Sequence, residues 1–163
     1  MILNPKEIIE TWIISWLGIS EEKQVQQNGI DLTVNSIFTV ENDEPCILTE
    51  KERKRPINNK LEKTEYNWEK GWMLKAWKIY DVLFNEDIKI PWDASWMIMQ
   101  RSSLNRMWCF ITTGWWDSWF ENKVWGIIRP SLDIFIGENT RLAQFIAFKS
   151  DSASMYDWIY KKK

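Results

Sequence analysis

Short apolar segments separated by turn-forming residues run from Ile30 almost to the end of the chain, and this pattern limits the fold more than any other feature. The segments are IDLTVNSIFTV (30–40), WMLKAWKIYDVLF (72–84), IKIP (88–91), WMIMQ (96–100), CFITT (109–113), KVWGIIRP (123–130), LDIFIG (132–137) and RLAQFIAFK (141–149). Many short strands with frequent turns are typical of barrels and jelly rolls. The sequence therefore predicts a mainly β fold, a distorted β-barrel or jelly roll.

A short amino-terminal helix is predicted over about residues 5–16. Asn4 is placed as N-cap, Pro5 occupies the first helical position, and Glu7 completes a capping box. The apolar residues recur at spacings of three and four, which predicts one buried face: Ile8, Ile9, Trp12, Ile13 and Trp16. We expect this helix to support the fold and not the chemistry.

The chain of 163 residues predicts a single domain, 1–163, because that length is enough for one self-sufficient core. Residues 41–65 are polar and contain the basic run KERKR, so we expect a solvated surface hairpin or loop there. Residues 156–163, YDWIYKKK, are predicted to form a frayed C-terminal tail.

The overall charge and the cysteines exclude several classes of function. A formal net charge of -2 provides no broad positive field for nucleic acid. No apolar run approaches the length of a membrane span. Cys46 and Cys109 lie far apart and form no metal-ligand spacing. We therefore expect a cytoplasmic protein with two reduced thiols, without structural zinc, and without nucleic acid or a membrane as partner.

The chain contains no histidine, which excludes a Ser-His-Asp triad, a Cys-His dyad and an HExxH zinc site. Acid–base chemistry near neutral pH must then use a carboxylate, a lysine, a tyrosine or a metal-bound water.

Three polar positions are candidates for such chemistry. QRSSL at 100–104 combines an arginine with two hydroxyls, which match the oxygens of a phosphate chain, although Arg-Ser-Ser is also an ordinary loop sequence. Asp31 and Asp117 are either turn-formers or functional carboxylates. Phosphate donors, one carboxylate for a metal's water shell and another that activates water suffice to hydrolyse a phosphoanhydride. Aromatic residues beside Asp117 are suited to stacking on a sugar or a base.

Several segments together resemble the trimeric dUTPase and dCTP deaminase superfamily, particularly the dUTPases of archaeal type. They are MILNPKEII, QVQQNGIDLTV, IPWDASWMIMQRSSLNRMW, TTGWWDSWFENK, NTRLAQFIAF and YDWIY, and they leave 41–65 unmatched. The resemblance implies a β-clip barrel and a homotrimer with active sites at the subunit interfaces. It also implies Mg²⁺ as cofactor and hydrolysis of dUTP, or of another pyrimidine deoxynucleotide triphosphate, to the monophosphate and pyrophosphate.

The resemblance also implies roles for individual residues. Arg101, Ser102 and Ser103 match the phosphate-binding motif. Asp31 matches the aspartate associated with the magnesium water shell. Gln144 matches a nucleotide-contacting motif near the C-terminus.

On the nucleoside side, Asp117 matches the aspartate that meets the deoxyribose 3′-hydroxyl and orients the attacking water. Phe120 lies where the family has an aromatic against the sugar. Gln27 and Asn28 are expected to shape the site, and Arg106 fits both the hydrolase and the deaminase branch.

One position separates hydrolase from deaminase. A dCTP deaminase carries its catalytic glutamate ten residues after the aspartate of the third motif, and here that residue is Ile127. Isoleucine transfers no protons, so dUTP hydrolysis is the favoured activity. The alternatives are a dCTP deaminase in which Glu121 takes the acid–base role, and a non-catalytic nucleotide-binding homologue.

Tryptophan often occurs where the family has glycine. The clearest cases are Trp108, Trp119 and Trp158, and further ones are Trp77, Trp96 and Trp125. The chain has thirteen tryptophans and only six glycines. One hypothesis is that the native gene uses UGA codons for glycine that are rendered here as tryptophan. The alternative is a genuinely Trp-rich protein whose indoles fill its core and trimer interface.

Overall fold

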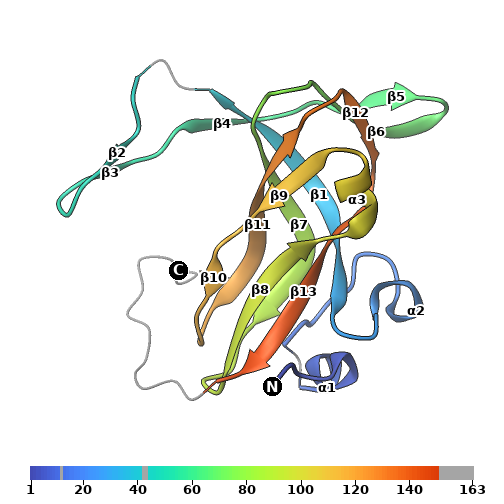
Figure 1. The fold of residues 1–163 in the computed structure, drawn as a ribbon, viewed down its shortest axis with the longest axis vertical. Helices are drawn as coiled ribbons and strands as arrows, with labels where there is room; N and C mark the ends of the chain where they lie inside the picture. Colours follow the sequence, from blue (N-terminus) through green and yellow to red (C-terminus); the bar gives the residue numbers. More distant parts are fainter. Residues whose placement is uncertain (12, 42–43, 151–163) are drawn as a thin grey trace.

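One curled, eight-stranded sheet dominates the computed structural model, which describes residues 1–11, 13–41 and 44–150 (Figure 1). Its strands are β1 (Ile30–Glu41), β4 (Ile57–Lys60), β7 (Tyr80–Lys89), β8 (Ala94–Gln100), β9 (Cys109–Thr112), β10 (Trp115–Trp116), β11 (Glu121–Pro130) and β13 (Arg141–Lys149). Their order is β10-β8-β13-β1-β7-β11-β9, with β4 paired to the second half of β1. The predicted mainly β class is confirmed.

Two smaller sheets complete the described part of the chain. One contains β12 (Ile134–Gly137), β6 (Glu69–Leu74) and β5 (Thr64–Tyr66), and the other contains β2 (Ile47–Leu48) and β3 (Arg53–Lys54). The β2–β3 hairpin, which lies in the polar stretch, projects from the main sheet (Figure 1). That stretch also supplies β4, so part of it belongs to the main sheet.

The amino-terminal helix α1 (Pro5–Glu10) is shorter than predicted. Its N-cap is confirmed, because the Asn4 side chain accepts a hydrogen bond from the Lys6 N–H at 2.9 Å. The helix ends early because residues 13–15 are extended beside β7, where the Lys89 N–H donates to the Ile13 carbonyl at 2.8 Å. Trp16 is consequently exposed, and Trp12 lies outside the described residues.

Two further helices were not predicted: α2 (Glu21–Gln24), and α3 (Ser102–Arg106), which occupies the expected turn after β8. Among the residues described, no helix is both long and apolar enough to cross a membrane. The segment predicted as one strand at 72–84 is two strands, β6 and β7, in different sheets. The turn between them contains Trp77, which has a positive φ of 63°.

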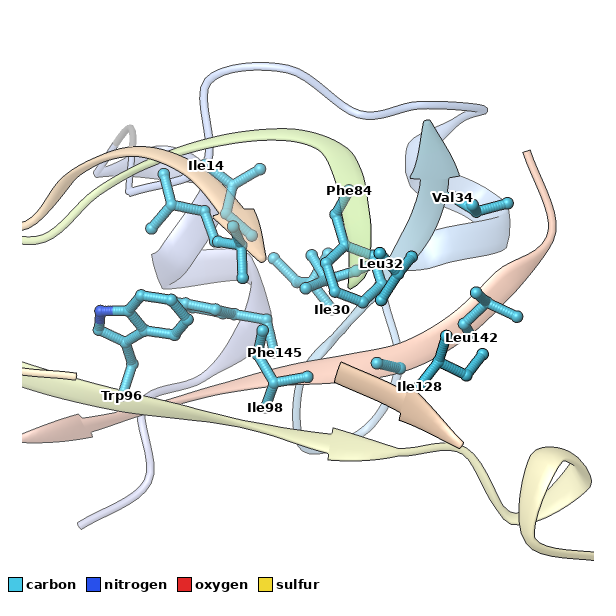
Figure 2. Packing of buried hydrophobic residues seen from close by; sticks show 14 of the residues in the cluster. Ile14, Ile30, Leu32, Val34, Phe84, Trp96, Ile98, Ile128, Leu142 and Phe145 are labelled. Carbon is cyan, nitrogen blue, oxygen red and sulfur yellow. The ribbon is translucent and has the colours of Figure 1, made fainter. Parts of the chain in front are cut away.

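The hydrophobic core lies inside the curl of the main sheet (Figure 2). Alternate residues of β1, Ile30, Leu32 and Val34, point into it, as the two-residue period of a strand requires. The intervening residues Asp31 and Thr33 are nevertheless 1% and 0% exposed. Polar groups therefore cover the other face of β1, and the candidate site begins there.

Candidate active site

A buried carboxylate, that of Asp31, lies where three strands meet. Asp31 pairs in register with Gln144 of β13, and β13 pairs in turn with β8, whose end carries Arg101. The Asp31 Oδ2 lies 3.0 Å from Arg101 Nε and 3.3 Å from an Nη of Arg141. The Gln144 amide donates to the other oxygen at 3.5 Å. The structure thus brings together three predicted site residues, Asp31, Arg101 and Gln144.

Two guanidinium groups face one carboxylate in this cluster. Burial raises the pKa of the Asp31 carboxyl above its ordinary value, although Arg101 and then Arg141 act to lower it. With Asp31 ionised, the three groups leave one net positive charge. Both guanidinium groups are about one-third exposed and carry unused N–H donors toward solvent. The cluster therefore suits an anionic ligand such as a phosphate.

The same cluster fits a magnesium ion poorly. Mg²⁺ prefers free oxygen ligands in octahedral geometry, whereas both Asp31 oxygens are already paired with donors. Within residues 1–11, 13–41 and 44–150, no three carboxylate or thiol side chains gather as a metal site. The described part of the chain therefore contains no preformed magnesium site, and we assign no reaction step to the metal.

The other residues predicted for the phosphate side are exposed: Ser102, Ser103, Arg106, Gln27 and Asn28. Ser102 and Ser103 open α3 directly after Arg101, and Gln27 and Asn28 form the turn into β1. Gly29 ends that turn, and a Cβ there would lie 2.4 Å from the Phe145 carbonyl oxygen. Glycine is therefore needed for β1 to approach β13 and align Asp31 with Gln144.

A cavity of about 620 Å³ lies elsewhere, beside the segment that joins β9 to β11. Asp117 and Phe120 both line it, with Trp115 and Trp116. The Phe120 ring is 6% exposed and packs on Trp116 with ring centroids 5.0 Å apart. Asp117 is exposed. A carboxylate beside aromatic rings in a concave site of this size suits a nucleoside.

Another part of the cavity wall comes from the polar stretch and β7, through Arg55, Asn58 and Asp81. The Asn58 amide donates to the Asp81 carboxylate, and burial raises the pKa of Asp81 above its ordinary value. Sequence reasoning missed this wall because the stretch matched no motif and its charges are typical of a solvated loop. The pairing of β4 with β1 brings it to the cavity.

Ile127 also lines the cavity. Glu121, the residue considered for a deaminase role, is absent from its wall and lies 3.3 Å from Lys89 in an exposed ion pair. Among the described residues, no other glutamate lines the cavity. The position that would carry a deaminase's catalytic glutamate is therefore apolar, and no neighbouring glutamate replaces it.

The Asp31 cluster and the cavity lie far apart in one chain. Trp116 pairs with Trp96 on β8, and Arg101 follows Trp96 by five residues. At about 3.3 Å per residue, the strand separates the two positions by roughly 16 Å. None of the predicted phosphate-side residues lines the cavity. One chain therefore does not bring Asp117 and Phe120 together with Arg101 and Asp31.

Sequence reasoning also missed Arg141 and Glu86. Arg141 begins β13 three residues before Gln144, and its spacing from a predicted site residue was the available signal. Glu86 is fully buried and accepts hydrogen bonds from the Thr33 N–H and hydroxyl and from the Gln24 amide. The same Gln24 amide also donates to the Asp31 carbonyl at 2.7 Å, so this network fixes the strand that carries Asp31.

Comparison with solved structures shows the fold, and a family model shows the family. The chain superposes on the crystal structure of 2′-deoxycytidine 5′-triphosphate deaminase from Agrobacterium tumefaciens with a TM-score of 0.67. The match covers 90% of this chain and 47% of that chain, at 17% sequence identity, and so shows a common fold. A family model described as dCTP deaminase-like matches residues 5–150. The chain belongs to this dCTP deaminase-like family, as the resemblance predicts.

The named relatives come from archaea. A deoxyuridine 5′-triphosphate nucleotidohydrolase of Methanocaldococcus jannaschii is 32% identical over 143 residues, which are 86% of this chain and 89% of the relative. A probable deoxyuridine 5′-triphosphate nucleotidohydrolase of Methanosarcina acetivorans is 29% identical over 153 residues, 90% of this chain and 85% of the relative.

Proposed function

We propose that this chain is a dUTP diphosphatase, which hydrolyses dUTP to dUMP and pyrophosphate. The observation that carries the proposal is the composition of the cavity, where Asp117 and Phe120 lie with the apolar Ile127 and without a glutamate. The archaeal relatives named as dUTP nucleotidohydrolases support it. The lack of a glutamate disfavours the deaminase alternative.

The phosphate end of the substrate is assigned to the Asp31 cluster. Arg101 and Arg141 hold their guanidinium groups in place through the buried Asp31 carboxylate. Arginine binds phosphate oxygens through paired N–H donors, and its positive charge offsets the charge that gathers on departing pyrophosphate. Ser102 and Ser103, at the start of α3, add hydroxyl and backbone N–H donors.

The nucleoside end is assigned to the cavity. Asp117 accepts a hydrogen bond from the sugar hydroxyl and from the attacking water, and Phe120 forms the aromatic wall beside the sugar. As water bonds to phosphorus, the bond between the α- and β-phosphates breaks, pyrophosphate leaves, and the water gives up a proton that the Asp117 carboxylate is suited to accept.

A complete site needs more than one copy of the chain under this proposal. The strand position next to Asp117 lies roughly 16 Å from Arg101. At that distance, Arg101 and Asp117 of one chain cannot both contact the same phosphate group and its attacking water. A symmetric homotrimer brings the Asp31 cluster of one subunit to the cavity of the next. Magnesium belongs to the proposal only as an ion that arrives with the triphosphate, because the residues that the structure describes form no preformed site for it. An assay of dUTP hydrolysis without Mg²⁺ tests whether the reaction needs the ion.

The direct test measures release of pyrophosphate from dUTP and of ammonia from dCTP. Asp117→Asn should lower the pyrophosphate rate at least about 100-fold, because general-base catalysis contributes that much or more. Glu121→Gln is the matched control, since Glu121 lies outside the cavity, and it should keep the parent rate.

Unchanged turnover in Asp117→Asn would contradict the role of Asp117. Ammonia release from dCTP would favour the deaminase alternative. Nucleotide binding by the parent chain without release of either product would favour a non-catalytic homologue.

A further inference from the structure

Four tryptophans have backbone conformations that suit glycine. Six described residues other than glycine have positive φ, and apart from Asn67 and Asn139 all of them are tryptophan: Trp68, Trp77, Trp108 and Trp119. None of the six glycines has positive φ. Asparagine tolerates this region, whereas a bulky residue there is a genuine outlier. Tryptophan therefore occupies the positions where glycine is normally found.

Trp68 lies in the tightest of these turns. Asn67 and Trp68 are the two residues that join β5 to β6, with φ of 48° and 67°. A two-residue hairpin loop with positive φ at both positions is the signature of a type I′ turn, for which Asn-Gly is strongly preferred. The Trp68 side chain is fully exposed and packs on nothing.

Trp108 lies at the end of α3. Met107 is the C-cap of the helix, and Trp108 follows it with a φ of 53°. The Trp108 N–H donates to the Asn105 carbonyl at 3.0 Å, one of the two bonds of a Schellman motif. Glycine is the residue that most often ends a helix in this way.

Trp77 and Trp119 lie in turns that their backbone N–H groups tie to distant segments of the chain. The Trp77 N–H donates to the Pro130 carbonyl at 2.8 Å, and the Trp119 N–H to the Ile90 carbonyl at 3.1 Å. Both turns fix the path of the main chain between strands, so the φ values of 63° and 68° are required by the fold.

The four indole side chains contribute no specific contact in return. Among the described residues, none of the four stacks on another ring, lies under a cation or donates a hydrogen bond from its indole. They are between 41% and 101% exposed. By contrast, Trp72 is fully buried and its indole N–H donates to the Leu61 carbonyl at 3.1 Å. A functional or packing role for the four is therefore unsupported.

We infer that residues 68, 77, 108 and 119 are glycines in the protein as its own cell makes it, encoded by UGA codons that this sequence renders as tryptophan. The inference rests on backbone geometry and is independent of the proposed function. The same geometry does not extend to Trp96 and Trp125, which lie in strands without positive φ. Trp158 lies outside the described residues.

Mass spectrometry of the native protein tests the inference directly. Peptides that cover the four positions should each be lighter by the difference between a tryptophan and a glycine residue. Tryptophan at these positions in native peptides, or UGG codons there in the gene, would overturn the inference.

A recombinant comparison tests the geometry separately. Each of the four tryptophans is replaced in turn by glycine and by alanine, and the thermal midpoint is measured. Both changes remove the indole, but only glycine adopts a positive φ without strain. The thermal midpoint of the glycine variant should therefore be roughly 2–4 °C higher than that of the alanine variant at each position. Trp16 and Trp92 are exposed and do not have positive φ. At these two control positions, the thermal midpoint of the alanine variant should be equal to or higher than that of the glycine variant. Alanine as good as glycine at all four positions would contradict the inference.

Discussion

Gly18 is the residue at which the buried polar network is tightest. A Cβ on Gly18 would lie 2.0 Å from the Thr33 hydroxyl oxygen and 3.0 Å from a carboxylate oxygen of Glu86. Real atoms do not approach so closely, so the network has room only for a glycine there. At the four tryptophans with positive φ, a large side chain is present where glycine would be unstrained. Each of them costs the folded state about 1–2 kcal/mol in backbone strain. Four such costs are large beside the roughly 5–15 kcal/mol that stabilises a typical domain.

Gly18→Ala should therefore destabilise the fold by about 1–3 kcal/mol, because the added methyl group must displace Thr33 or Glu86. Gly114→Ala is the matched control: a Cβ there meets nothing within 4 Å, and Gly114 has no positive φ. It should change the free energy of unfolding by less than about 0.5 kcal/mol. Urea unfolding of both variants measures the difference, and equal effects would refute the packing argument.

At the scale of elements, Glu86 joins the amino-terminal segment to the sheet. It belongs to β7, and its carboxylate accepts hydrogen bonds from Gln24 of α2 and from Thr33 of β1. Burial raises the pKa of this carboxyl above the ordinary glutamate value. Since the folded state then holds a proton that the unfolded state has released, this contribution to stability is complete at low pH and is lost as pH rises through the folded pKa.

Glu86→Gln should accordingly gain stability relative to the parent as pH rises from about 4 to about 7. The expected gain is about 1.4 kcal/mol for each unit by which burial raises the pKa. Unfolding free energies of both proteins at several pH values check this, with the exposed Glu121→Gln as control for general charge effects. A parent–variant difference that stays constant with pH would contradict the assignment.

Most strands were predictable from apolar runs bounded by turn residues, and β13 matches its predicted range of 141–149. The strand predictions fail where the residues between two strands are not typical turn formers. The break between β6 and β7 contains Trp77, and the β5–β6 hairpin contains Asn67-Trp68 where Asn-Gly is the usual signal. Both turns were overlooked because tryptophan favours strands and does not mark a turn.

The candidate site was predictable to a similar degree. Asp31, Arg101 and Gln144 lie together because each is in or directly beside one of three adjacent strands. Arg141 and the wall formed by Arg55 and Asn58 were not predictable, since their approach depends on strand pairing between segments distant in sequence.

At the scale of the whole molecule, the distance between the Asp31 cluster and the cavity makes the proposed activity depend on the assembly of more than one chain. Arg101 directly follows the end of β8, whereas Asp117 directly follows β10, which pairs with the first half of β8. If each active site takes Arg101 from one subunit and Asp117 from the next, two different inactive variants complement one another.

Arg101→Ala and Asp117→Asn should each be inactive alone, and a mixture unfolded and refolded together should regain activity. In randomly mixed trimers, about a quarter of the sites combine an intact Arg101 with an intact Asp117. Pyrophosphate release from dUTP measures the recovery, and separately refolded proteins mixed afterwards provide the baseline. A mixture no more active than its components would show that each chain builds its site alone.

The sheet order has a practical consequence for producing the protein. β1 lies between β13 and β7, and both of these strands come later in the chain than residue 68. In a host that terminates translation at UGA, a gene with that codon at position 68 yields a product ending no later than Asn67. Such a fragment has a central strand without either long neighbour, and its exposed edges favour aggregation. A synthetic gene with glycine codons at the four positions is therefore the appropriate template for expression.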